Sequence, residues 1–230
     1  MRYFFIVIII FTTCSVFGQE NKFRLGFSLA PSFTNVRGPQ YFDKVDNLYR
    51  NKTQRGSLKI VFGANLEYEI RDKFSLTLGL NYARKGGLLA NPIYYSDYQT
   101  GEVIESLYGE NITDYVRKYI TMPFFGSFKF GPKKTFFLNG GVFGGFLLSS
   151  TKDAFYWSKT NSYRFDAGLL IGLGGMLDLS DKFALSFEFR NNLGLVNIDN
   201  TPELGSMTLK TNSFNIITGL SWKLGEMDSK

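Results

Sequence analysis

The chain has 230 residues, of which 44% are hydrophobic and 20% are charged, and its formal net charge is +6. This composition excludes an intrinsically disordered protein and allows one large β domain or two small domains. The sequence contains no histidine and a single cysteine, Cys14, so catalytic and metal sites built from these residues are not expected. The mildly basic charge identifies no partner.

Residues 1–18 are typical of a secretory signal peptide. Arg2 supplies a positive charge, Tyr3–Phe11 is an uninterrupted apolar run, and Val16 and Gly18 are small residues at the −3 and −1 positions. We therefore expect cleavage between Gly18 and Gln19. A membrane anchor is the alternative, but the apolar run is much shorter than the roughly 20 residues that a spanning helix needs.

Beyond the signal peptide, apolar and polar residues alternate in eight segments, and no stretch predicts a helix. Period-two alternation predicts strands with two different faces. Most of the segments exceed the roughly five or six residues of an ordinary strand and match the length of a tilted membrane strand. The segments are Phe23–Thr34, Ser57–Ile70, Phe74–Gly87, Asp114–Gly131, Thr135–Thr151, Asn161–Leu179, Phe183–Ile198 and Asn212–Leu224.

The connections between the segments alternate in length. Three short ones are Arg71–Lys73, Pro132–Lys134 and Ser180–Lys182, and the long ones are Asn35–Gly56, Leu88–Thr113, Lys152–Asn161 and Asp199–Thr211. Alternation puts all short turns at one end of an antiparallel sheet. Residues 19–230 are therefore predicted to form an all-β, eight-stranded antiparallel transmembrane β-barrel, an up-and-down meander.

The two faces of the strands distinguish a soluble barrel from a membrane barrel. In the segment that begins at Phe74, Phe and Leu occupy one face, whereas Ser75, Thr77 and Asn81 occupy the other. The interior of an eight-stranded barrel is only wide enough to be filled by side chains, so eight rows of Phe and Leu would not fit inside it. The apolar face is therefore predicted to contact lipid.

Aromatic residues at the strand ends predict interfacial girdles, although some rings would lie there by chance in a chain with 17% aromatic residues. Beside the short turns these residues are Phe23, Tyr68, Phe74, Phe130, Phe136, Phe183 and Trp222. At the other end they are Phe33, Tyr82, Tyr115, Phe155, Tyr156, Trp157 and Tyr163.

Charged residues on the polar faces are predicted to lie in the lumen. Buried charges are costly unless they are paired, so we expect an ion-pair network that fills the barrel. The alternatives are a polar path for ions or acid–base chemistry at Glu67 and Glu69, but no nucleophile or metal set accompanies them, and no cofactor is expected. The network residues are Arg24, Glu67, Glu69, Arg117, Lys129, Arg164, Asp166, Asp178, Glu188 and Arg190.

The two longest connections have opposite charge. Residues 35–56 hold five Lys or Arg against two Asp, whereas residues 88–113 hold four acidic residues, four tyrosines and no Lys or Arg. They could pack together as a cap or be solvated independently, and both interpretations stay open. Tyrosine-rich surfaces favour protein contacts, and binding of a polysaccharide is the alternative.

Five strings resemble the PorT-like outer-membrane β-barrel family of Bacteroidota: LNYARKGG from Leu80, KYITMPFFGSFKFG from Lys118, FDAGLLIGLGG from Phe165, ALSFEFRNNLGLVNI from Ala184 and SFNIITGLSWKLG from Ser213. The resemblance implies an outer-membrane location. Because the family's namesake belongs to the type IX protein-secretion machinery, it also implies an accessory role in secretion. Thr121–Pro123 lacks the acidic residue that family members often have there, so the subgroup stays open.

The last segment carries Gly219, Trp222 and Leu224 in a spacing similar to the signal that barrel-assembly machinery recognises on a terminal strand. An edge strand offers unpaired backbone groups, which explains why such a strand can be recognised. The alternative is an ordinary lipid-facing strand with one glycine.

Together these features predict a non-enzymatic outer-membrane barrel, PorT-like, with both termini in the periplasm. The expected partners are outer-membrane lipid, the barrel-assembly machinery and type IX secretion components, and no nucleic acid is expected. A small porin-like or structural barrel that binds a surface partner is the second hypothesis, and an envelope-lipid hydrolase is the third.

Overall fold

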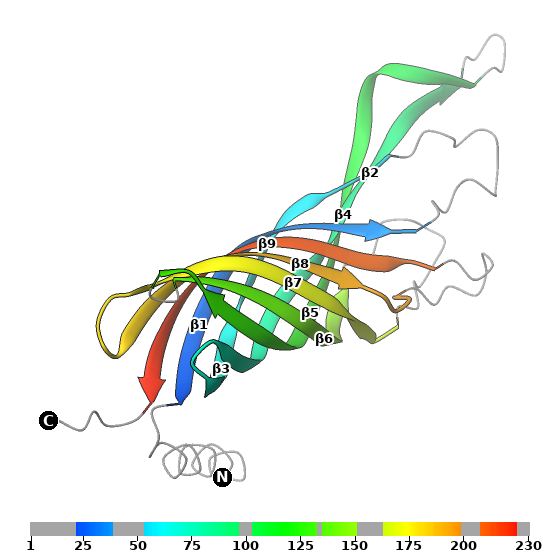
Figure 1. The fold of residues 1–230 in the computed structure, drawn as a ribbon. Coiled ribbons are helices and arrows are strands. Elements are labelled where there is room, and N and C mark those ends of the chain that lie inside the picture. The colour runs from blue at the N-terminus through cyan, green and yellow to red at the C-terminus, as the bar shows by residue number, and fades with distance from the viewer. Residues whose placement is uncertain are drawn as a thin grey trace, which may run out of the picture.

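The computed structural model describes residues 22–38, 53–96, 103–132, 135–150, 163–198 and 208–224. Within these residues all regular structure is β, as the coloured ribbon in Figure 1 shows. The strands are β1 Phe23–Arg37, β2 Thr53–Arg55, β3 Ser57–Arg71, β4 Phe74–Ser96, β5 Val103–Phe130, β6 Phe136–Ser150, β7 Phe165–Asp178, β8 Phe183–Gly194 and β9 Lys210–Leu224. Each of the eight predicted segments overlaps one of the long strands, and β1, β3, β4, β5 and β9 extend beyond the predicted bounds.

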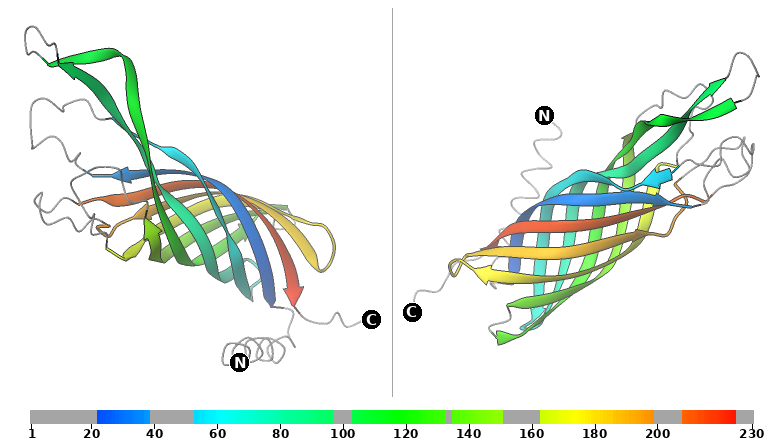
Figure 2. Two further views of the ribbon diagram at one scale, coloured as in Figure 1. Left: turned by 180° about the vertical axis from the view of Figure 1, so that it is seen from behind. Right: turned by 90° about the horizontal axis from the view of Figure 1, so that it is seen from above.

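The eight long strands close into an antiparallel barrel. Apart from β2, each strand pairs with the next one along the chain, and β1 pairs with β9 from Phe23↔Leu224 to Arg37↔Lys210. This confirms the predicted eight-stranded barrel. We call the end where β1 begins and β9 ends the near end, and the opposite end the far end (Figure 2).

The three short turns lie at the near end. In the turn between β7 and β8, the Ser180 Oγ accepts hydrogen bonds from the Phe183 N at 3.1 Å and the Lys182 N at 3.4 Å. Between β5 and β6, Gly131 has a φ of 80°, a conformation that favours glycine. Local side-chain and backbone chemistry therefore sets these turns.

The structure corrects one prediction, because most of the predicted connection Leu88–Thr113 is a continuation of two strands. The β4 and β5 strands stay paired from Leu88↔Asp114 to Ser96↔Val103 and form a hairpin that projects beyond the far end (Figures 1 and 2). A register shift between Pro92 and Tyr94 accommodates the proline, and the aromatic and β-branched residues around it favour strand.

The base of this hairpin is hydrogen-bonded to strands β1 and β2. Gly86, with a φ of 150°, exchanges two hydrogen bonds with the Thr34 hydroxyl on β1, at 2.8 and 3.0 Å. Strand β2, which lies within the predicted connection Asn35–Gly56, pairs with β4 at Leu88–Ala90. The end of the basic connection therefore pairs with the base of the acidic one.

The outer wall of the barrel is apolar, with Phe27, for example, 62% exposed. Among the described residues, no helix is long and apolar enough to cross a membrane. Aromatic rings contact one another around the near end, as the predicted girdle requires. The centroid distances are 4.8 Å for Phe23–Tyr68, 5.7 Å for Phe74–Phe128, 5.9 Å for Phe130–Phe136 and 6.2 Å for Phe183–Trp222.

The interior is less polar than the alternation predicts. Phe125, Phe143 and Leu170 form a buried apolar cluster inside the barrel. Glycines on the neighbouring strands make room for large interior side chains: a Cβ at Gly141 would lie 2.6 Å from the Phe125 Cβ, and one at Gly172 would meet the Glu188 carboxylate. The lumen is therefore filled by alternating small and large residues.

Candidate functional site

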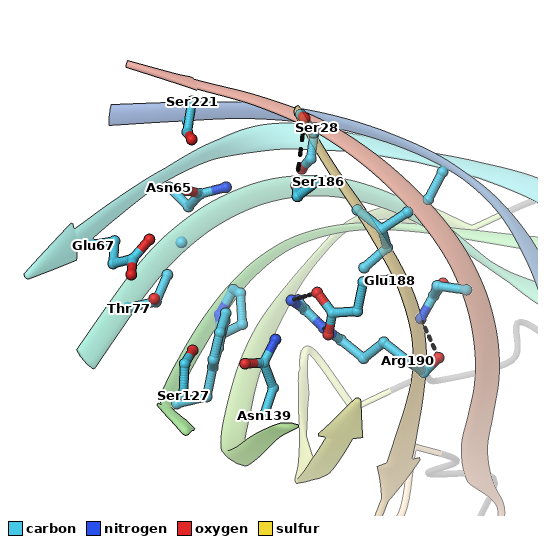
Figure 3. Close-up of a pocket in the computed structure, with 18 of the residues that line it drawn as sticks. Ser28, Asn65, Glu67, Thr77, Ser127, Asn139, Ser186, Glu188, Arg190 and Ser221 are labelled. Carbon is cyan, nitrogen blue, oxygen red and sulfur yellow. Dashed lines mark hydrogen bonds and ion pairs between the residues drawn. The ribbon is translucent and has the colours of Figure 1, made fainter. Parts of the chain in front are cut away.

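The lumen holds a bidentate ion pair on β8. The Arg190 Nε and Nη2 each donate to one Glu188 carboxylate oxygen at 2.7 Å, as Figure 3 shows. The two residues are two apart in one strand, so both point inward. The Arg190 guanidinium also lies 4.5 Å from the centre of the Phe125 ring on β5. The charges of Glu188 and Arg190 therefore neutralise each other on one strand. The Arg190 side chain also extends across the interior to β5.

A second group of charges lies nearer the short turns. The Lys129 Nζ on β5 lies 2.6 Å from the Glu67 carboxylate and 3.9 Å from that of Glu69, both on β3. One lysine thus faces two carboxylates across the intervening strand β4. Glu67 and Glu69 are therefore counter-ions of Lys129. Pairing with this lysine is a structural reason for the two carboxylates to lie side by side.

The third group, the far-end cluster, consists of Lys85, Asp166 and Thr211. The Lys85 Nζ on β4 donates to the Asp166 carboxylate on β7 at 2.8 Å, and the Thr211 hydroxyl on β9 donates to the same oxygen at 2.9 Å. The Asp166 side chain is fully buried. Since β5 and β6 separate β4 from β7, this ion pair spans the lumen.

Aromatic residues surround the lysine of the far-end cluster. The Lys85 Nζ lies 4.2 Å from the centre of the Phe143 ring and 5.6 Å from that of Tyr119. Arg117, which is also buried, lies opposite Lys85 in the β4–β5 register. Charged and aromatic groups from the four strands β4, β5, β6 and β7 therefore converge at one level of the barrel.

A cavity of about 100 Å³ occupies the half of the lumen nearer the short turns (Figure 3). This volume has room for on the order of seven to ten water molecules. Glu67, Lys129, Glu188 and Arg190 line it, whereas Lys85, Asp166 and Thr211 do not. The far-end cluster therefore lies between the cavity and the far end. Among the residues described, no group of His, Cys, Asp and Glu is placed to hold a metal ion.

Comparison with protein families gives a match over most of the chain. Residues 17–200 match the family model described as outer membrane protein beta-barrel domain. The chain belongs to this family. Strand β9 lies beyond the matched range, yet it completes the barrel by pairing with β1 and β8. The protein is therefore a small eight-stranded barrel of the outer membrane.

Two solved outer-membrane barrels show the same fold. The outer membrane protein OprG from Pseudomonas aeruginosa has 12% identity and a TM-score of 0.54, with 91% of this chain and 99% of OprG covered. The outer membrane protein AlkL, whose structure was determined in lipid bilayers, has 13% identity and a TM-score of 0.50, with 91% and 93% covered. At such identities the likeness concerns the fold alone. No curated protein matches the sequence.

Within this outer-membrane barrel, the predicted lumen residues do not all meet. Arg117 and Arg24 are both buried, and Arg24 donates to the Met176 sulfur at 3.4 Å. Arg164 and Asp178, which were predicted to lie in the lumen, are exposed to solvent. Arg164 precedes the first residue of β7 and Asp178 is its last, so strand alternation does not hold these side chains inside the barrel.

Two lysines of the lumen were missed. Lys85 belongs to the far-end cluster, and the Lys59 Nζ on β3 lies 2.6 Å from the Asp114 carboxylate on β5. Both were detectable, because Lys59 shares the face of Asn65 and Lys85 shares that of Thr77 under strict alternation. The sequence signal is weaker for Lys85, because this residue lies two positions before Gly87, the predicted end of its strand.

The residues of the predicted assembly signal lie on opposite faces of β9. Gly219 is buried, Trp222 is exposed on the outer wall, and Leu224 pairs with Phe23. In the closed barrel β9 has partners on both sides, so recognition of its edge would have to precede closure. The predicted cleavage site, Gly18 and Gln19, lies outside the described residues, and recognition by the assembly machinery stays a prediction.

Proposed function

We propose that this outer-membrane barrel conducts no solutes, catalyses no reaction and binds a protein partner through its β4–β5 hairpin. The observation that supports this most directly is the free edge of the hairpin. Residues Val103–Tyr115 of β5 have β4 as their one strand partner within the described part of the chain, because pairing with β6 begins at Arg117. Unpaired backbone groups of this kind bind an added strand.

The composition of the hairpin favours a protein over other ligands. Residues 88–113 carry four tyrosines, a residue type enriched in protein interfaces, and four carboxylates. The partner class follows from the PorT-like resemblance, which points to components of type IX protein secretion. With the termini in the periplasm, as we propose, the hairpin is on the cell-surface side.

The filled lumen supports the non-conducting part of the proposal. The Lys85–Asp166 ion pair spans the barrel, and the neighbouring apolar cluster of Phe125, Phe143 and Leu170 is buried. A porin-like function is the second candidate, favoured by the polar cavity of about 100 Å³. Planar-bilayer recordings separate the two: a stable open conductance from the purified protein would contradict a filled lumen.

Partner binding is tested with a shortened hairpin. Replacing residues 91–111 by an Asn-Gly turn keeps the Ala90↔Ile112 pair and closes the strands with a favoured two-residue loop. Affinity purification from native outer membranes should recover secretion components with the natural chain and lose them with the shortened one. A variant shortened within residues 200–207, another connection at the far end, is the control and should retain them. Recovery of the same proteins by both shortened variants would refute the role of the hairpin.

A further inference from the structure

Two cations lie side by side on the outer wall of the barrel. Arg84 on β4 and Lys118 on β5 are directly opposite each other in the β4–β5 register. Their chain neighbours Ala83, Lys85, Arg117 and Tyr119 are buried inside the barrel, so alternation directs Arg84 and Lys118 outward. Lys118 is exposed and Arg84 is half-buried. This pair is separate from the lumenal charges.

A pair of like charges facing each other across two strands is unfavourable unless a counter-ion is present. Neither Arg84 nor Lys118 has an ion-pair partner within the described residues, and the Arg84 Nε is shielded without a hydrogen-bond partner. The two carboxylates at the far end whose side chains are described, Asp114 and Asp166, are already paired with Lys59 and Lys85. The missing anion must therefore come from outside this part of the chain.

The height of the pair in the membrane indicates which anion is available. On β4 the outward residues from Phe74 to Tyr82 are apolar or aromatic, and Arg84 is the next outward position. Ten residues from Phe74 to Arg84 at about 3.4 Å each, on a strand tilted by about 40°, rise about 26 Å above the near-end girdle. The apolar band of such barrels is about 25 Å tall. Arg84 and Lys118 therefore lie at the second membrane interface, where lipid headgroups are.

We propose that Arg84 and Lys118 form a binding site for the phosphate group of a membrane lipid at the far-end interface. The forked guanidinium of Arg84 can donate two parallel hydrogen bonds to phosphate oxygens, and the Lys118 ammonium adds a compact point charge. Bound phosphate relieves the repulsion between the two side chains. The site depends on the outer-membrane location and is independent of the hairpin's partner.

Lipid binding by the purified full-length chain in a neutral detergent tests this site. Native mass spectrometry would compare phosphatidic acid with diacylglycerol of the same acyl chains, and the natural chain should retain phosphatidic acid selectively. The double variant R84Q/K118Q should bind phosphatidic acid about tenfold more weakly, as expected for the loss of charge-assisted hydrogen bonds. R84K, which keeps the charge, should retain an intermediate affinity.

The matched control is K73Q/K182Q, which removes two exposed lysines from turns at the near end and should leave phosphatidic acid binding unchanged. Folding of every variant is verified by heat-modifiable migration. If R84Q/K118Q fails to fold, K118Q alone is used in its place, because it changes only an exposed side chain. Equal retention of phosphatidic acid and diacylglycerol would overturn the proposal. So would an unchanged affinity of the folded charge-removal variants, or displacement of the lipid by an equal concentration of inorganic phosphate.

Discussion

The ion pair between Lys85 and Asp166 offers the sharpest test of how the barrel is held together. In D166N the Lys85 ammonium, whose side chain is 4% exposed, loses its counter-ion at 2.8 Å. The nearby Phe143 and Tyr119 rings attract the cation but do not neutralise it. Removing one partner of a buried ion pair costs about 3–5 kcal/mol of unfolding free energy. With an m-value of about 2 kcal/mol/M, the urea midpoint should fall by about 2 M.

The assay is reversible urea unfolding in lipid vesicles, followed by the fluorescence of tryptophan. Trp222 lies on the lipid-facing wall and should report the loss of the barrel. The matched control is D114N, which breaks the Lys59–Asp114 pair, whose aspartate side chain is 47% exposed. Because water reaches the Asp114 side of that pair, although the Lys59 side chain is only 5% exposed, D114N should cost less than D166N.

A double variant separates the cost of an unpaired charge from a simple loss of packing. K85M/D166N removes the charges of both partners of this pair, so it should be more stable than D166N alone. The reasoning fails if D166N and D114N shift the urea midpoint equally, or if K85M/D166N is no more stable than D166N.

Two further predictions concern the packing and the turns. The variant G172V places a side chain against the Glu188 carboxylate and should cost about 1–3 kcal/mol, whereas G140A, where no atom lies within 4 Å of the added Cβ, should be neutral in the same unfolding assay. Equal midpoints for G172V and the natural chain would show that the lumen has more free space than the structure contains. The variant S180A removes the acceptor for the Phe183 N and should cost about 1 kcal/mol, and an unchanged midpoint would show that water replaces it.

The strands of the barrel were predictable because one physical rule, apolar outside and polar inside, repeats in every strand. The same rule failed for Phe125 and Phe143, since β5 and β6 carry phenylalanine on both faces and the pattern does not show which phenylalanines point inward. Which charges pair across the lumen depends on strand register around the closed barrel. Glu188 and Arg190 are neighbours on one strand and were placed together, whereas the Lys85–Asp166 contact links residues 81 apart in sequence.

The projecting hairpin was the least predictable element, and its charge bears on what it can bind. An exposed strand edge risks pairing with the same edge of another copy, and charged residues on the strand are a common protection. Residues 88–113 carry acidic side chains and no Lys or Arg, so two identical hairpins repel each other. A basic partner strand meets no such repulsion and gains electrostatic attraction. The edge of β5 is therefore better suited to a basic protein segment than to a second copy of this chain.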